Sequence, residues 1–91
     1  MSGTQILIVD DERIMRDSLA GWLTRDGHEV ETAASGEEAL EIIKNKRFDI
    51  LLVDIKMEGI SGLEVLRQVT ENDPDVAVIM ITAYGSISTA I

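Results

Sequence analysis

The sequence predicts a doubly wound α/β fold, in which helices cover the faces of a parallel sheet. Continuous apolar runs rich in β-branched residues occur at residues 6–9, 50–53 and 76–81. Such runs are typical of strands that are buried on both faces. Helical patterns lie between these runs, so strands and helices alternate along the chain. Right-handed crossovers between parallel strands then produce a doubly wound sheet.

The first helix is predicted to follow the run at 6–9. Apolar side chains then recur at the spacing of one helical face: Met15, Leu19, Trp22 and Leu23. We expect this face, including Trp22, to lie in the core, and Gly27 stands where the helix would end. Residues 29–33 alternate between charged and apolar side chains, which predicts a half-exposed edge strand.

Two further helices are predicted from capping boxes. In Ser35-Gly36-Glu37-Glu38 and in Ser61-Gly62-Leu63-Glu64, a serine precedes a glutamate by the spacing that caps a helix N-terminus. The helix that begins after Ser35 is expected to end near the basic residues Lys44, Lys46 and Arg47. The helix that begins after Ser61 is expected to end before Pro74. The predicted order is therefore β-α-β-α-β-α-β, with another segment beginning after Gly85.

Length and charge limit the function. The chain has 91 residues, enough for one small domain, and 8 Lys+Arg against 17 Asp+Glu give it a net charge of −9. This charge argues against nucleic-acid binding and against binding to an anionic membrane. There is no cysteine, and we find neither a signal-peptide pattern nor an apolar run long enough to span a bilayer. We expect an acidic cytoplasmic domain.

Polar residues follow the buried runs at the points where those strands would end. Asp10, Asp11 and Glu12 follow the first run, Asp54 follows the second and Thr82 follows the third. Taken one at a time, each Asp at these positions could be no more than a turn former or a helix cap. Several carboxylates at one sheet edge repel one another unless a cation relieves them, and Mg²⁺ prefers such oxygen ligands. Asp54 stands alone after its strand, which makes it a candidate nucleophile for a phosphoryl group.

These residues resemble the receiver domain of bacterial response regulators. The resemblance runs from Ile6 to Ile91 and rests on the Asp10-Asp11 pair, on Asp54-Ile55-Lys56-Met57-Glu58-Gly59-Ile60-Ser61-Gly62, and on Thr82-Ala83. It implies a flavodoxin-like sheet with strand order 2-1-3-4-5. It also implies a signalling domain rather than an enzyme.

The resemblance assigns roles to individual residues. Asp54 would accept a phosphoryl group from a sensor histidine kinase. The implied magnesium ligands are Asp10 through a water, Asp11, Asp54 and the backbone carbonyl of Lys56. Thr82 would hydrogen-bond to the phosphoryl oxygens, and Tyr84 would be the aromatic switch residue that turns inward.

The chain departs from the receiver pattern in two places. Glu58 stands where the family usually has proline, which adds charge near the site. The family's fifth strand, the lysine before it and the fifth helix would lie beyond Ile91, so we expect residues 1–91 to be a receiver domain that is incomplete at its C-terminus. Residues 76–81 would then lack a neighbour on one side, and dimerisation or an exchange of elements would cover that edge.

The segment from Thr82 to Ile91 resembles the receivers of sigma-54-dependent transcriptional activators. This likeness implies an AAA+ ATPase and a DNA-binding domain in the parent protein.

Three other functions are alternatives to this interpretation. A flavin-binding electron carrier needs a phosphate-binding loop after the first strand, where Asp10, Asp11 and Glu12 would repel the phosphate. An aspartate-nucleophile phosphatase needs a second carboxylic acid two residues after the nucleophile, and that position is Lys56. A receiver fold that acts only as a docking surface, without a working phosphorylation switch, stays open.

Overall fold

The structure, a computed structural model, describes residues 3–81 and 87–90, and its elements follow the predicted alternation. They are β1 (Gln5–Val9), α1 (Arg13–Arg25), β2 (Glu29–Ala33), α2 (Gly36–Asn45), β3 (Ile50–Asp54), α3 (Gly62–Asn72), β4 (Ala77–Ile81) and β5 (Ile87–Ala90). Within these described ranges, no helix is long and apolar enough to cross a membrane.

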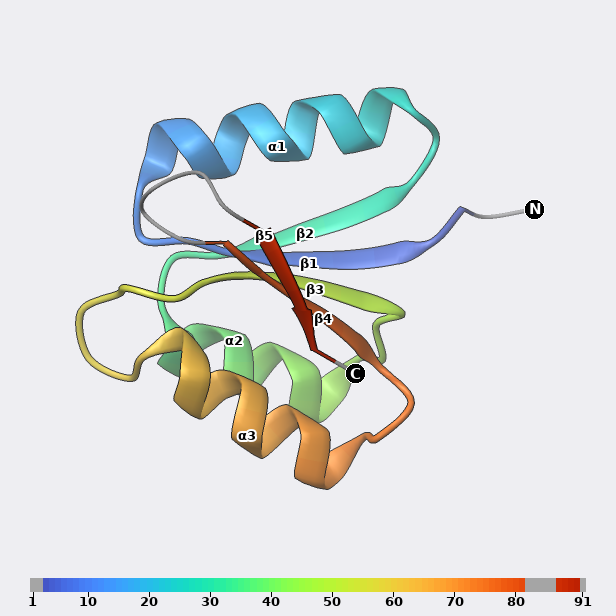
Figure 1. Cartoon of the computed structure of the whole chain (residues 1–91). Helices are drawn as coiled ribbons and strands as arrows, with labels where there is room; N and C mark the ends of the chain where they lie inside the picture. The colour runs from blue at the N-terminus through green and yellow to red at the C-terminus, as the bar shows by residue number, and fades with distance from the viewer. Residues whose placement is uncertain (1–2, 82–86, 91) are drawn as a thin grey trace.

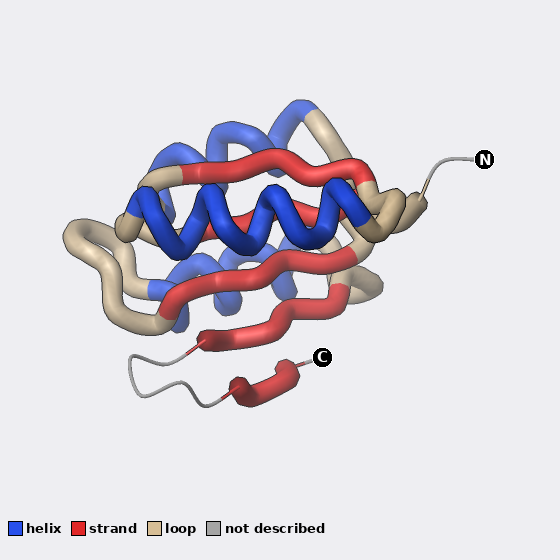
Figure 2. Tube along the Cα trace, turned by 90° about the horizontal axis from the view of Figure 1, so that it is seen from above, coloured by secondary structure: helices blue, strands red, loops and turns tan. Residues whose placement is uncertain are grey.

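The strands form one sheet in the order β2-β1-β3-β4-β5 (Figures 1 and 2). The first four strands of this order are parallel, which confirms the predicted order 2-1-3-4, and β2 is an edge strand as its alternating sequence indicated. In the register, Val9 lies between Ala33 and Val53. The C-terminal ends of β1 and β3 are therefore level with each other at one end of the sheet.

The strand β5 corrects one expectation. Nothing after Ile81 was expected to pair with β4, but β5 runs antiparallel to β4, with Ile81 opposite Ile87 and Val78 opposite Ala90. A parallel strand needs a long crossover, whereas an antiparallel strand needs only a short reversal of the chain. The expectation rested on a parallel strand, and the residues after Ile81 are too few for a crossover followed by such a strand. The described residues contain no fifth parallel strand and no helix after β4, and β4 has the neighbour on each side that its apolar sequence predicted.

The core lies mainly between the sheet and the α2–α3 layer. Figure 1 shows α2 and α3 covering one face of the sheet and α1 covering the other. One cluster of almost fully buried side chains includes residues of β1, β3 and β4, namely Leu7, Val9, Leu51, Val53, Val78 and Met80, and residues of α2 and α3, namely Ala39, Val65 and Val69. This layer holds β1 and β3 rigidly where their ends carry the carboxylates.

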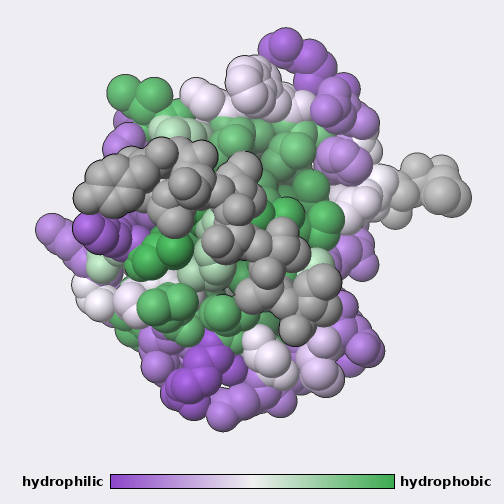
Figure 3. All heavy atoms as spheres, in the orientation of Figure 1, coloured by the Kyte–Doolittle hydropathy of each residue, from purple (hydrophilic) through white to green (hydrophobic). Residues whose placement is uncertain are grey.

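The opposite face is less well covered. None of the side chains of α1 is buried, and Met15 and Trp22 are 43% and 67% exposed. The expectation that Trp22 lies in the core is therefore wrong. The helix α1 packs mainly on β1 and β2, and Leu52 and Ile79, farther along the same face, are half-buried. In the orientation of Figure 1, Figure 3 shows hydrophobic side chains gathered across the middle of the molecule, with polar side chains above and below them.

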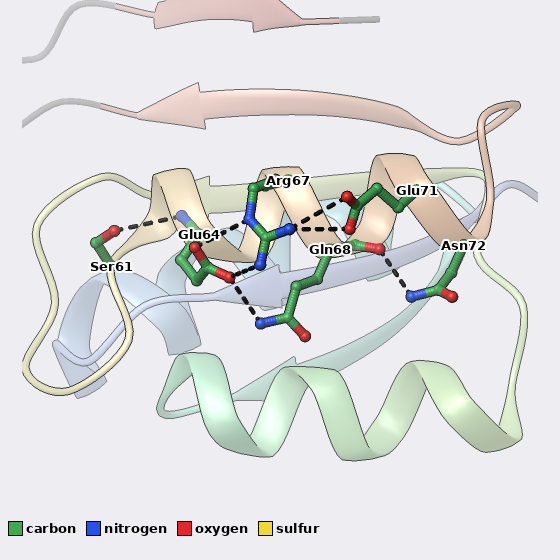
Figure 4. A network of polar contacts seen from close by, with 6 residues as sticks. All are labelled: Ser61, Glu64, Arg67, Gln68, Glu71 and Asn72. Carbon is green, nitrogen blue, oxygen red and sulfur yellow. Dashed lines mark hydrogen bonds and ion pairs between the residues drawn. The ribbon is translucent and has the colours of Figure 1, made fainter.

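Both predicted capping serines are N-caps. The hydroxyl of Ser35 accepts the backbone N–H of Glu38 (3.1 Å), and that of Ser61 accepts the N–H of Glu64 (3.3 Å). On α3 the Glu64 carboxylate turns along the helix to Arg67, which also pairs with Glu71 (Figure 4). The Ser61 cap marks where α3 begins, at the end of the loop that follows β3.

Candidate functional site

The carboxylates after β1 and β3 converge. Asp10 and Asp11 follow β1, and Asp54 is the last residue of β3. Each of the three offers a carboxylate oxygen, and these oxygens lie within 4.8 Å of one another. Parallel neighbouring strands of matched register bring their C-terminal ends together, which is where open α/β sheets bind ligands. Thr82 and Tyr84, which are also predicted site residues, lie outside the described residues.

Asp10 is held by contacts on both sides. It is 5% exposed, its backbone N–H donates to the carbonyl of Ala33 (3.1 Å), and its Oδ1 accepts the backbone N–H of Glu12 (2.8 Å). The guanidinium of Arg16, one turn into α1, donates to the carbonyl oxygen of Asp10 (2.8 Å). The start of α1 thus orients a buried carboxylate toward the end of β3.

Asp54 is half-buried, and its environment disfavours its charge. Burial raises the pKa of the Asp54 carboxyl above its ordinary value, and the negative charge of Asp10 raises it further, with smaller effects from Asp11 and Glu12. The backbone N–H of Lys56 donates to Asp54 Oδ1 (3.3 Å) and opposes this shift. The charges that raise the pKa come from residues on the neighbouring strand end, so a cation between them would relieve all of them at once.

The loop from β3 to α3 turns tightly beside Asp54. The N–H of Gly62 donates to the carbonyl of Ile55 (3.1 Å), and a Cβ at Gly62 would lie 2.2 Å from the carbonyl oxygen of Asp54. Only glycine fits at that approach. Gly59 has a φ of +78°, which also favours glycine. These two glycines allow the loop to bring Lys56 close to the carboxylates.

Contacts from two other segments hold the same loop. The backbone N–H of Glu58 donates to Asp11 Oδ2 (3.4 Å), and the N–H of Ile60 donates to Glu37 Oε2 on α2 (3.4 Å). Glu58, at the position where the family pattern has proline, thus uses its backbone N–H, and its side chain is exposed. Asp11 thus accepts a hydrogen bond from the loop, and one of its carboxylate oxygens lies within 4.8 Å of those of Asp10 and Asp54.

Sequence reasoning missed two of these residues. Arg16 in α1 contacts Asp10, and Glu37 in α2 contacts the β3–α3 loop. No motif marks them, because each contact depends on how a helix is placed against a distant part of the sheet.

The arrangement is suited to a hard divalent cation. It supplies several carboxylate oxygens at an open strand end and leaves room for other oxygen ligands, which is the coordination that Mg²⁺ prefers. Comparison with known proteins decides the family: a model of the response regulator receiver domain matches residues 6–91. The chain belongs to the response regulator receiver domain family.

Curated proteins that this receiver domain matches include longer response regulators. It is 42% identical over 84 residues to the response regulator MprA of Mycobacterium sp. (strain KMS), and the match covers 92% of this chain and 36% of that protein. The receiver domain thus spans about a third of the length of the curated relatives it matches.

Solved structures show the same fold. The response regulator TrrA from Thermotoga maritima, crystallised with Mg(2+)-BeF, has a TM-score of 0.85 at 42% identity, covering 89% of this chain and 70% of that one. A complex of TrrA with the histidine kinase ThkA gives a TM-score of 0.84 at 41% identity, covering 91% of this chain and 72% of that one. This chain is therefore a receiver domain of a two-component response regulator, a signalling module.

Proposed function

We propose that Asp54 accepts a phosphoryl group from a sensor histidine kinase, in a reaction that depends on Mg²⁺. The observation that carries this proposal is the position of Asp54: it ends β3, it is half-buried, and it lies within 4.8 Å of two other carboxylates. A lone carboxylate beside a cation site is suited to attack phosphorus. Both its neighbours, Asp10 and Asp11, come from the adjacent strand end.

The donor set fits Mg²⁺. Asp11 and Asp54 would bind the ion directly, the backbone carbonyl of Lys56 would add a third oxygen, and Asp10 would act through a water. The pKa of the Asp54 carboxyl is raised first by burial and then by the negative charges of Asp10, Asp11 and Glu12, and a bound cation would offset those charges. Bound Mg²⁺ supplies charge neutralisation for the carboxylates and for a phosphoryl group, and it orients the phosphoryl oxygens.

The residues of the chain have separate tasks in the transfer. One carboxylate oxygen of Asp54 forms the new bond to phosphorus as the bond from phosphorus to the donor group breaks, and the donor keeps that electron pair. The N–H of Lys56 donates to Asp54 Oδ1, which holds the carboxylate in one orientation during the attack. Thr82 then hydrogen-bonds to the phosphoryl oxygens and Tyr84 turns inward, as the family pattern implies.

The proposed partners follow from the relatives. TrrA, a similar receiver, has been crystallised with the histidine kinase ThkA, and we extend a kinase partner of this class to the present chain. Because the chain matches only 36% of MprA, we further propose that phosphorylation controls an attached effector. The likeness of residues 82–91 to sigma-54-dependent activators makes an AAA+ ATPase with a DNA-binding domain the proposed effector.

The test is phosphorylation by a small phosphodonor. The chain is incubated with acetyl phosphate with and without Mg²⁺, and intact mass spectrometry counts phosphoryl adducts. We expect an adduct only with Mg²⁺, and none in Asp54→Asn. The matched control is Asp49→Asn, which changes an aspartate just before the other end of β3 and should leave the adduct intact.

Two results would overturn the assignment. An adduct that persists in Asp54→Asn places the acceptor elsewhere. A wild-type chain that is folded, binds Mg²⁺ and forms no adduct would favour the alternative, a receiver fold that serves only for docking.

A further inference from the structure

A cavity of about 530 Å³ opens between the C-terminal ends of α2 and α3. Its lining includes Phe48 and Val76, which precede β3 and β4, so it lies at the opposite end of the sheet from Asp54. Its floor is apolar and buried, with Phe48, Leu51, Val69 and Val76 between 1% and 6% exposed. A volume of this size is typical of small-molecule sites, which are mostly apolar with a few polar groups at fixed places.

The rim of this cavity is basic in a chain of net charge −9. Three of the eight Lys and Arg residues line it: Lys44, Lys46 and Arg47. Lys44 pairs with Glu41 (3.1 Å) and Lys46 pairs with Glu31 (3.0 Å). Arg47 makes no ion pair with any described residue. Among the described residues, the rim therefore offers one cation without an ion-pair partner, Arg47, next to an apolar floor, and the lining also holds the carboxylate of Asp73.

Hydrogen bonds occupy part of the free carbonyl groups at the ends of the two helices. Helix C-termini usually repel anions through their free carbonyl groups. In α2 the Asn45 side-chain amide donates to the carbonyl of Glu41 (3.3 Å), and in α3 the Asn72 amide donates to that of Gln68 (2.8 Å), as Figure 4 shows for α3. The single carboxylate of the lining, Asp73, accepts the backbone N–H of Asp75 (3.3 Å).

We propose that this cavity binds a small organic monocarboxylate with an apolar body. The carboxylate pairs with the Arg47 guanidinium, whose planar fork matches two carboxylate oxygens. The apolar part lies on Phe48, Val69 and Val76. A single negative charge suffices, because the other two cations of the rim already have carboxylate partners. The proposal is independent of phosphoryl transfer, since the length of β3 separates the cavity from Asp54.

The test uses 2-naphthoate as the probe and 2-naphthol as its uncharged counterpart. Amide chemical shifts of the ¹⁵N-labelled chain are followed during titration with each compound. We expect saturable shifts with 2-naphthoate among residues 43–48 and 68–76, and weaker binding of 2-naphthol. Arg47→Gln should weaken the binding of 2-naphthoate by about tenfold, which is the effect expected of one partly exposed, charge-assisted hydrogen-bonded pair. Arg25→Gln, at the end of α1, is the matched control and should bind like the wild type.

A second variant tests the location. Asn72 is an exposed residue of the lining, and Asn72→Trp should obstruct the cavity and reduce binding while the helix remains folded, as circular dichroism would verify. Binding that is unchanged in both Arg47→Gln and Asn72→Trp would overturn the proposal. So would an absence of saturable shifts, or equal affinity for 2-naphthol. Loss of phosphorylation in the Asp54 experiment would leave these results unaffected.

Discussion

Replacing Asp54 with Asn should stabilise the fold when no divalent ion is present. The substitution keeps the size of the side chain and an oxygen that accepts the Lys56 N–H, but it removes the repulsion between Asp54 and the carboxylates of Asp10 and Asp11. At the 4.8 Å limit of the cluster, each pair repels by about 0.9 kcal/mol in a water-like dielectric, so two pairs amount to about 2 kcal/mol. Salt at physiological strength reduces this by about half.

The expected gain in unfolding free energy is therefore about 1 kcal/mol at pH 7, or about 4–8 °C in Tm for a domain of this size. This gain should depend on pH. Because the pKa of Asp54 is raised in the folded state, the Asp54 carboxyl stays protonated to higher pH in the folded protein than in the unfolded chain. The wild type thus loses stability as pH rises from about 3.9 through the raised pKa, whereas Asp54→Asn does not. Below that window the two proteins should differ little.

The assay is urea unfolding with a chelator present, at pH 7 and at pH 3.5, for the wild type and for Asp54→Asn. The matched control is Asp75→Asn, an exposed aspartate between α3 and β4, which should change stability by less than about 0.5 kcal/mol at both values. A variant no more stable than the wild type at pH 7 would refute the reasoning. A gain that is equally large at pH 3.5 would show that the carboxylate charge is not its cause.

Two further outcomes test the site and its loop. Mg²⁺ at a hundredfold excess over its dissociation constant should raise the unfolding free energy by about 2.7 kcal/mol, and Asp11→Asn should remove most of this gain. Melting curves with and without Mg²⁺ measure both effects. A wild type whose melting curve does not respond to Mg²⁺ would contradict the cation site. Gly62→Ala should destabilise the domain by about 1–3 kcal/mol, because its Cβ would lie 2.2 Å from the Asp54 carbonyl oxygen. In Gly21→Ala nothing lies within 4 Å of the new Cβ, so that helical control should be stabilised by up to about 1 kcal/mol in the same urea experiment; equal effects of the two would contradict the close approach.

The sheet could be predicted closely because its signals are local. The continuous apolar runs mark strands buried on both faces, and the serines Ser35 and Ser61 mark helix starts by hydrogen bonds to residues three positions away. Two features were not predicted in the same way. The spacing of apolar residues predicted the helix α1. It could not show that α1 would pack mainly on β1 and β2, in a position where Trp22 is exposed.

The antiparallel pairing of β5 is the other feature. The sequence of residues 87–90 is short and mixed in polarity, and its direction depends on the free edge of β4, which belongs to another part of the chain. Strand propensity says little about direction, because both directions pair the same backbone groups.

By itself, the sequence determined which residues are candidates for the site: carboxylates stand after strands, and strands of one parallel sheet end on the same side. Tertiary structure alone decided how closely they meet, which of them is buried, and which neighbours hold them. Asp10 is buried while Asp11 is exposed, although they are adjacent in sequence. Arg16 and Glu37 contact the site from two helices. These features depend on distances between segments far apart in the chain, and those distances are set by how the helices pack on the sheet rather than by any local pattern.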